Sequence, residues 1–108
     1  MKIRLDSGWM VHSDERILER LAEEGHGPSW MIASDLDYQR FHVARRCRML
    51  AEAEFVEREQ RDGFADEWYI TTWGVLYLKG ELDADLRRPD PGMRPGGRVR
   101  PSWYAEFG

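Results

Sequence analysis

The chain has 108 residues with a formal net charge of −4, and its 33 % of charged and 12 % of aromatic residues are typical of one compact soluble domain with a modest core. No apolar run approaches the ~20 residues that span a bilayer, and the charged start MKIRLD does not resemble a secretory signal peptide. A single cysteine, Cys47, excludes an intrachain disulfide and favours a reducing cytoplasm.

The first predicted helix covers residues 14–24. Ser13 is a typical N-cap, and Asp14 and Glu15 lie in the first turn, where the helix dipole favours acids. Apolar residues then recur at helical spacing, and Gly25 is expected to stop the helix.

Two further helices are predicted before residue 54. Pro28 and Ser29 open a short second helix, and Asp37 and Tyr38 form a tight connection to a third helix over about residues 39–53. The buried stripe of the third helix has the spacing i, i+4 and i+7: Val43, Cys47 and Leu50.

A hairpin and a last helix follow. A strand starts at Phe55 and Val56, the segment 61–63 (Arg-Asp-Gly) signals a turn, and residues 68–71 are aromatic and β-branched, which predicts the return strand. Thr71 or Thr72 is then expected to cap a helix that runs through about Leu86.

The order helix, helix, helix, hairpin, helix predicts a mainly α fold with a small β-hairpin (α+β), which is the layout of a winged helix-turn-helix. We expect an amino-terminal segment over residues 1–12 and the winged helix-turn-helix, with a carboxy-terminal dimerisation helix, over residues 13–87. Prolines, glycines and arginines predict a flexible tail over residues 88–108.

The third predicted helix carries a run of arginines opposite its buried stripe. Arg45 and Arg48 point outward on a helical projection, and Arg46 lies on the flank. No acidic residue occurs within residues 38–51. Arginine matches a guanine edge or a phosphate with paired hydrogen bonds, so we expect DNA contact, although solvated helix faces also carry arginine.

The candidate DNA-binding residues lie on this helix and on the hairpin. The first half of such a helix usually reaches bases, whereas Arg48 is better placed for a backbone phosphate. The hairpin could reach a minor groove or a phosphate, but its acidic residues leave that contact open: Glu57, Glu59, Asp62, Asp66 and Glu67. The full set of candidates is Gln39, Arg40, His42, Arg45, Arg46, Arg48, Arg58 and Arg61.

The last predicted helix has two apolar sides. The side around Val75 is expected to pack on the domain. The opposite side combines large aromatic and small residues, which suits a two-fold homodimer interface: Trp73, Tyr77, Gly80 and Ala84. The alternative is that Trp73 and Tyr77 cover the amino-terminal segment, where Trp9 and Met10 also require burial.

Several stretches together resemble the small winged-helix regulators of halophilic archaea that are related to the phage phi-H repressor. They are WMVHSDERILERLAEEG, ARRCRMLAEAEFVE and WYITTWGVLYLKGELDA with the intervening hairpin, and they span residues 9–86. The resemblance implies a transcription regulator that binds duplex DNA as a dimer in a salt-rich cytoplasm. It also accounts for the preference for arginine over lysine.

This sequence departs from the related ones at two positions. Related sequences have Gly where the third helix turns into the strand, and this chain has Glu54. If the helix ends there in a left-handed residue, Glu54 is strained. Trp68 replaces the more common Tyr at the start of the return strand.

No catalytic, cofactor or small-molecule site is expected. The three histidines, His12, His26 and His42, form no metal pair at helical spacing, and Cys47 on the core stripe is most simply a small buried hydrophobe. The rival interpretation is a winged-helix protein–protein interaction module in a transcription or replication complex that makes no direct DNA contact.

Overall fold

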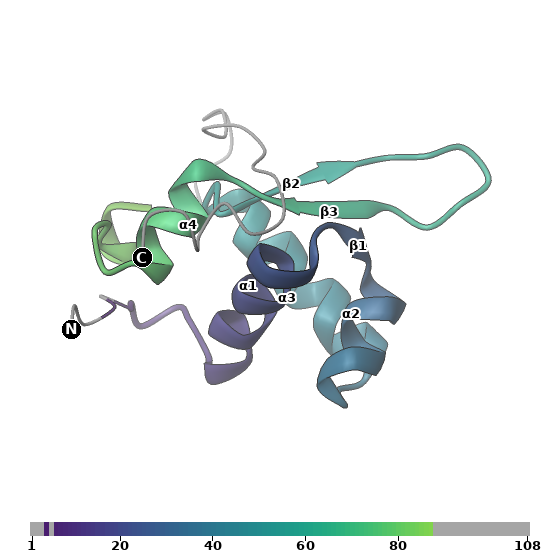
Figure 1. Cartoon of the computed structure of the whole chain (residues 1–108), viewed down its shortest axis with the longest axis horizontal. Coiled ribbons are helices and arrows are strands. Elements are labelled where there is room, and N and C mark those ends of the chain that lie inside the picture. The colour runs from purple at the N-terminus through teal and green to yellow at the C-terminus, as the bar shows by residue number, and fades with distance from the viewer. Residues whose placement is uncertain (1–3, 5, 88–108) are drawn as a thin grey trace.

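The computed structural model describes residue 4 and residues 6–87. Three helices form one cluster, the hairpin projects away from them, and the last helix lies at the opposite end of the hairpin from its tip (Figure 1). The tail predicted for residues 88–108 lies outside the described residues. In chain order the elements are α1 (His12–Glu24), β1 (Gly27–Pro28), α2 (Ser29–Leu36), α3 (Arg40–Glu52), β2 (Val56–Glu59), β3 (Glu67–Ile70), α4 (Thr72–Leu78) and a 3₁₀ helix η1 (Ala84–Arg87).

The predicted fold class is confirmed, with one strand that the sequence did not reveal. The sheet is antiparallel with the order β1-β3-β2, and Trp68 pairs with Gly27 on one side and Arg58 on the other. The extra strand, β1, has two residues and contains Pro28. Proline is tolerated there because β1 is an edge strand.

Helix α1 begins earlier than predicted, and Ser13 is not its N-cap. The N-cap is Val11 in extended conformation, and its backbone N–H donates to the Asp14 carboxylate at 3.0 Å. Ser13 lies inside the first turn and its hydroxyl contacts α3 instead. Gly25 ends the helix with a φ of 95°, as predicted.

Helices α2 and α3 end in the same way. Asp37 and Glu54 are the two non-glycine residues with positive φ in the described part of the chain, at 60° and 69°. The N–H of Glu54 donates to Ala51, and that of the next residue, Phe55, donates to Leu50, which is the pairing of a Schellman motif. Glu54 therefore adopts the left-handed conformation that the Gly of related sequences suggests for this position.

Helix α4 is much shorter than predicted, and Gly80 explains why. The helix ends at Leu78, and Gly80 takes a φ of 76°. The N–H groups of Gly80 and Glu81 donate to Tyr77 and Leu76 at 2.9 and 2.8 Å, which closes another Schellman motif. The expected helix through Leu86 is wrong, and Trp73, Tyr77, Gly80 and Ala84 do not form a stripe along one helix.

The core lies between the three-helix cluster and the sheet. The predicted stripe of α3 is confirmed, because Val43, Cys47 and Leu50 have no exposed surface. Burial raises the pKa of the Cys47 thiol to about 12, which keeps it protonated. Gly74 is required at the start of α4, since a Cβ there would overlap the Phe55 carbonyl oxygen. No helix in the described part of the chain is long and apolar enough to cross a bilayer.

Candidate nucleic-acid interface

The outward side of α3 presents three arginines and one phenylalanine. We call Arg40, Phe41, Arg45 and Arg48 the outer face of α3, and all four are exposed. Within the described part of the chain, no acidic side chain forms a salt bridge with these arginines. Their positive charge is therefore available to a ligand.

Arg46 does not belong to this face. Its Nε and Nη2 donate to the two carboxylate oxygens of Asp14, each at 2.8 Å, and Nη2 also donates to the Trp9 carbonyl oxygen. The hydrogen bond to Asp14 raises the pKa of Arg46, against the effect of its burial. Only 12 % of the Arg46 side chain and none of Asp14 is exposed. Arg46 joins α3 to α1, so its guanidinium is occupied within the domain, unlike those of the other arginines predicted to bind DNA on this helix.

The other two candidates on α3 are exposed at its amino-terminal end. Gln39 is the N-cap of the helix. His42 lies with Nε2 within 2.8 Å of the Ser13 hydroxyl, and its ring meets Tyr38 edge-on with centroids 5.9 Å apart. The orientation of His42 is thus held by α1 and by the turn before α3.

The arginines of the hairpin, or wing, are already bound to wing acids. Arg58 donates to Asp66 at 2.6 Å, and Arg61 donates to Glu67 at 3.1 Å. Both guanidinium groups also lie over aromatic rings, that of Arg58 over Trp68 and that of Arg61 over Phe64. The acid beside each arginine partly neutralises its charge, which weakens its attraction to a phosphate.

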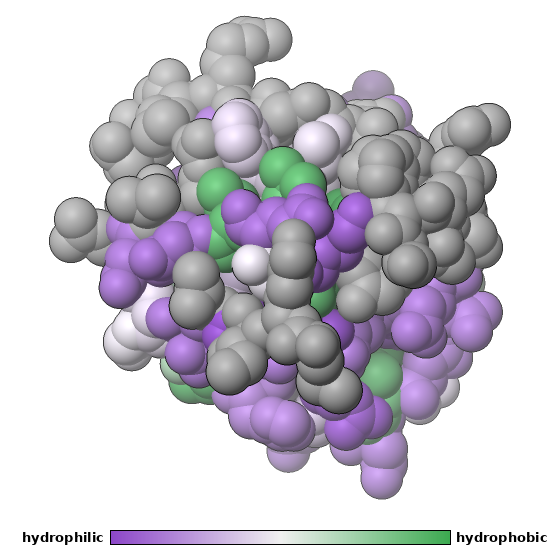
Figure 2. All heavy atoms as spheres, turned by 60° about the vertical axis from the view of Figure 1, so that its left-hand side comes forward, coloured by the Kyte–Doolittle hydropathy of each residue, from purple (hydrophilic) through white to green (hydrophobic). Residues whose placement is uncertain are grey.

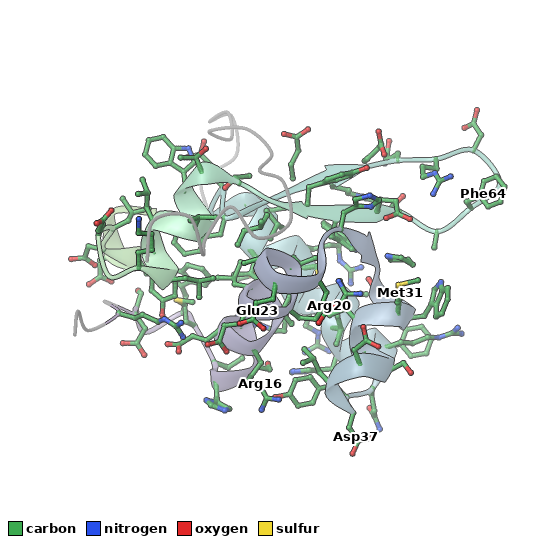
Figure 3. The ribbon with its side chains drawn as sticks, viewed as in Figure 1. Arg16, Arg20, Glu23, Met31, Asp37 and Phe64 are labelled. Atoms are coloured by element: carbon green, nitrogen blue, oxygen red, sulfur yellow. The ribbon has the colours of Figure 1, made fainter. Side chains whose placement is uncertain are left out.

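Phe64 marks the tip of the wing (Figure 3). Its side chain is 70 % exposed. The preceding residue, Gly63, has a φ of 75° that glycine adopts readily. Phe64 was not among the predicted site residues, although an aromatic residue directly after the turn glycine was a signal in the sequence.

A groove of about 230 Å³ lies between the outer face of α3, the start of α2 and the wing. Trp68 fixes the wing to α2, because its Nε1 donates to the Ser29 hydroxyl at 2.9 Å. The residues that line the groove are Ser29, Trp30, Arg40, Phe41, Ala44, Arg48, Ala65, Asp66 and Trp68. Trp30 and Phe41 were not among the residues predicted from the sequence to form the site.

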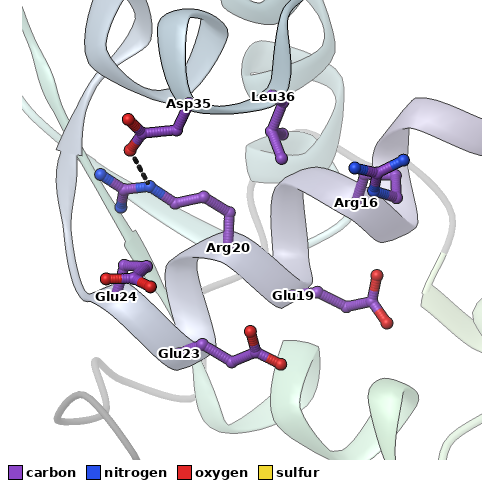
Figure 4. A pocket seen from close by; sticks show the side chains of 7 residues that line it. All are labelled: Arg16, Glu19, Arg20, Glu23, Glu24, Asp35 and Leu36. Atoms are coloured by element: carbon purple, nitrogen blue, oxygen red, sulfur yellow. Dashed lines mark hydrogen bonds and ion pairs between the residues drawn. The ribbon is translucent and has the colours of Figure 1, made fainter.

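A larger hollow of about 440 Å³ lies between α1 and α2 and is lined mainly by charged residues (Figure 4). Arg20, whose side chain is almost fully buried, donates to Asp35 at 2.9 Å and to the Gly25 carbonyl oxygen. These bonds join the end of α1 to α2. Among the described residues, no cluster of three or more His, Cys, Asp and Glu is arranged to hold a metal ion.

The expected dimer residues divide into two kinds. Tyr77 and Ala84 are fully buried within the chain, whereas Trp73 and Gly80 are partly exposed. Tyr77 stacks on Phe55 with ring centroids 5.3 Å apart. Two of the four residues are therefore unavailable to a second copy.

Tyr77 instead joins α4 to α1. Its hydroxyl donates to Glu15 at 2.8 Å, and burial followed by this bond raises its pKa well above the ordinary value. Trp9, in the amino-terminal segment, contacts the other partner of Tyr77, Phe55, at 6.0 Å between centroids. Tyr77 and Trp9 thus share Phe55 as a neighbour. On the side of the molecule where α4 lies, the described surface is mostly hydrophilic, with small hydrophobic areas (Figure 2).

Comparison with known proteins agrees with this architecture. A family model described as winged helix-turn-helix phage repressor matches residues 1–88. The crystal structure of the PhiH1 repressor-like protein from Haloarcula marismortui is similar, with a TM-score of 0.70 and 30 % sequence identity over 83 % of this chain and 100 % of that chain. No curated protein matches the sequence.

Proposed function

We propose, since this chain belongs to the family of winged helix-turn-helix phage repressors, that it is a sequence-specific double-stranded DNA-binding transcription regulator of the repressor type. The observation that carries the proposal is the outer face of α3. Three exposed arginines lie there without an acidic partner in the described chain, and no acid occurs within residues 38–51. Clustered cations of this kind bind a duplex even where the net charge of the protein is negative.

The candidate residues have different roles in this proposal. Gln39, Arg40, His42 and Arg45 lie in the half of α3 that would reach base edges, and Arg48 would bind a phosphate. Arg58 and Arg61 are secondary candidates, because Asp66 and Glu67 already hold them.

A homodimer in the cytoplasm is part of the proposal. Two copies related by a two-fold axis would place their recognition helices on successive half-sites of a palindromic operator. Tyr77 and Ala84 cannot form that interface without unfolding the domain, since both belong to its core. Of the expected face, Trp73 and Gly80 are partly exposed.

A rival function is a protein-binding winged helix. The acid-bound arginines of the wing and the exposed rings of Trp30 and Phe41 favour it. Selection from a random duplex pool, at stated salt concentrations, separates the two. Enrichment of one sequence supports the regulator, and a pool that stays random while the protein is folded supports the rival.

A further inference from the structure

Two large aromatic side chains are exposed beside the arginines of α3. Phe41 is 76 % exposed and Trp30 is 52 % exposed, and both line the groove between α3 and the wing. Apolar side chains gathered at a concave surface are typical of binding sites. Since the core leaves out Phe41, its ring is free to contact a ligand.

The positive charges beside these two rings indicate which class of ligand the groove would bind. Arg40 and Arg48 stand one helical turn before and after Ala44 on the same side of α3, and the Arg40 guanidinium lies 5.2 Å from the centre of the Phe41 ring. Asp66 is the one acid among the lining residues, and Arg58 neutralises it. The groove therefore offers an apolar patch bordered by cations. A complementary ligand has apolar groups with negative charges on either side of them.

Duplex DNA has this arrangement in its major groove. The C5-methyl group of thymine projects into the groove between two phosphate backbones, and phenylalanine and alanine are side chains that contact it. We propose, on the basis of the proposed function, that Phe41 together with Ala44 contacts thymine methyl groups of the operator. Phe41 is then a specificity-determining residue that recognises thymine without a hydrogen bond.

This contact is suited to a salt-rich solution. Salt weakens phosphate contacts steeply, because fewer counterions are released on binding. An apolar contact is not weakened in this way. The thymine preference should therefore persist at salt concentrations where the affinity for random duplex has been lost.

Replacement of thymine by uracil in the selected operator tests the proposal. Deoxyuridine lacks only the C5-methyl group, so each thymine is replaced singly and the dissociation constant is measured in high salt. The parent protein should lose affinity roughly four-fold for each methyl group that it buries. Phe41→Ala should bind the thymine operator more weakly by a similar or larger factor. The same uracil substitutions should no longer change the dissociation constant of the Phe41→Ala variant.

Phe64→Ala is the matched control, because Phe64 is also an exposed phenylalanine but lies at the wing tip. This variant should keep the uracil sensitivity of the parent, and thermal melting checks that both variants are folded. The thymine contact is overturned if Phe41→Ala is as sensitive to uracil as the parent, or if the parent itself is insensitive to uracil. Either result leaves the proposed function as a DNA-binding regulator unaffected. A folded parent that selects no duplex overturns both proposals and favours the rival function, a protein-binding winged helix.

Discussion

The guanidinium of Arg46 binds both carboxylate oxygens of Asp14, each at 2.8 Å. The same carboxylate accepts the backbone N–H of Val11 at the start of α1. One buried acid thus fixes the first turn of α1 and the middle of α3 relative to each other. The orientation of the outer face of α3 depends on this pair.

Arg46→Ala should lower the free energy of unfolding by about 3–5 kcal/mol, because it leaves a buried carboxylate without its counter-ion. Arg45→Ala is the matched control: it removes an exposed arginine from the preceding position and should leave the free energy of unfolding nearly unchanged. Denaturant titration of both variants measures the difference. Equal midpoints would contradict a structural role for Arg46.

Arg45→Ala and Arg48→Ala should weaken operator binding without lowering the melting temperature, since neither side chain is buried. Loss of Arg45 should cost ~1–3 kcal/mol and relax the preference at one base pair. Loss of Arg48 should weaken binding to all sequences alike and reduce the salt slope by about 1. Fluorescence anisotropy at several salt concentrations distinguishes the two effects, with Arg16→Ala on α1 as the control. Unchanged affinity in the Arg45/Arg48 double variant would remove this helix from the interface.

Glu54→Gly should be more stable than Glu54→Ala by ~1 kcal/mol, because only glycine adopts a φ of 69° without strain. Both variants remove the carboxylate, so their difference isolates the backbone contribution. We expect the glycine variant to melt slightly above the parent as well. A glycine variant no more stable than the alanine variant would mean that the end of α3 adopts another conformation.

Tyr77→Ala should destabilise the chain by about 3–5 kcal/mol, the cost of deleting a buried aromatic ring. Tyr77→Phe keeps the ring and loses only the bond to Glu15, which should cost about 1.5–3 kcal/mol. Thermal unfolding measures both, and sedimentation should give Tyr77→Phe the same oligomeric state as the parent. If the Tyr77→Phe variant instead sedimented as a smaller oligomer than the parent, with no change in melting temperature, Tyr77 would lie at a subunit interface.

The sequence by itself determined the order of the four helices and the hairpin and the buried stripe of α3, whereas the left-handed end at Glu54 was expected from the Gly of related sequences. These features depend on local rules: the periodicity of apolar residues, the residues that start and end helices, and the steric limits on φ. Arg45 and Arg48 also follow from periodicity, because the side opposite a buried stripe faces outward. The end of α4 before Gly80 also follows a local rule, because glycine often ends a helix. The sequence nevertheless predicted a longer helix, because the apolar pattern continues beyond Gly80.

Only the tertiary structure decided which of the outward residues a ligand can reach. Arg45 and Arg46 are adjacent arginines, but Arg46 binds the buried carboxylate of Asp14, which is 32 residues away in the sequence. Tyr77 likewise donates a hydrogen bond to Glu15, which is 62 residues away in the sequence. The groove at Phe41 likewise joins residues from α2, α3 and the wing. Such contacts depend on how the elements pack, and the spacing of residues along one helix carries no information about a partner on another.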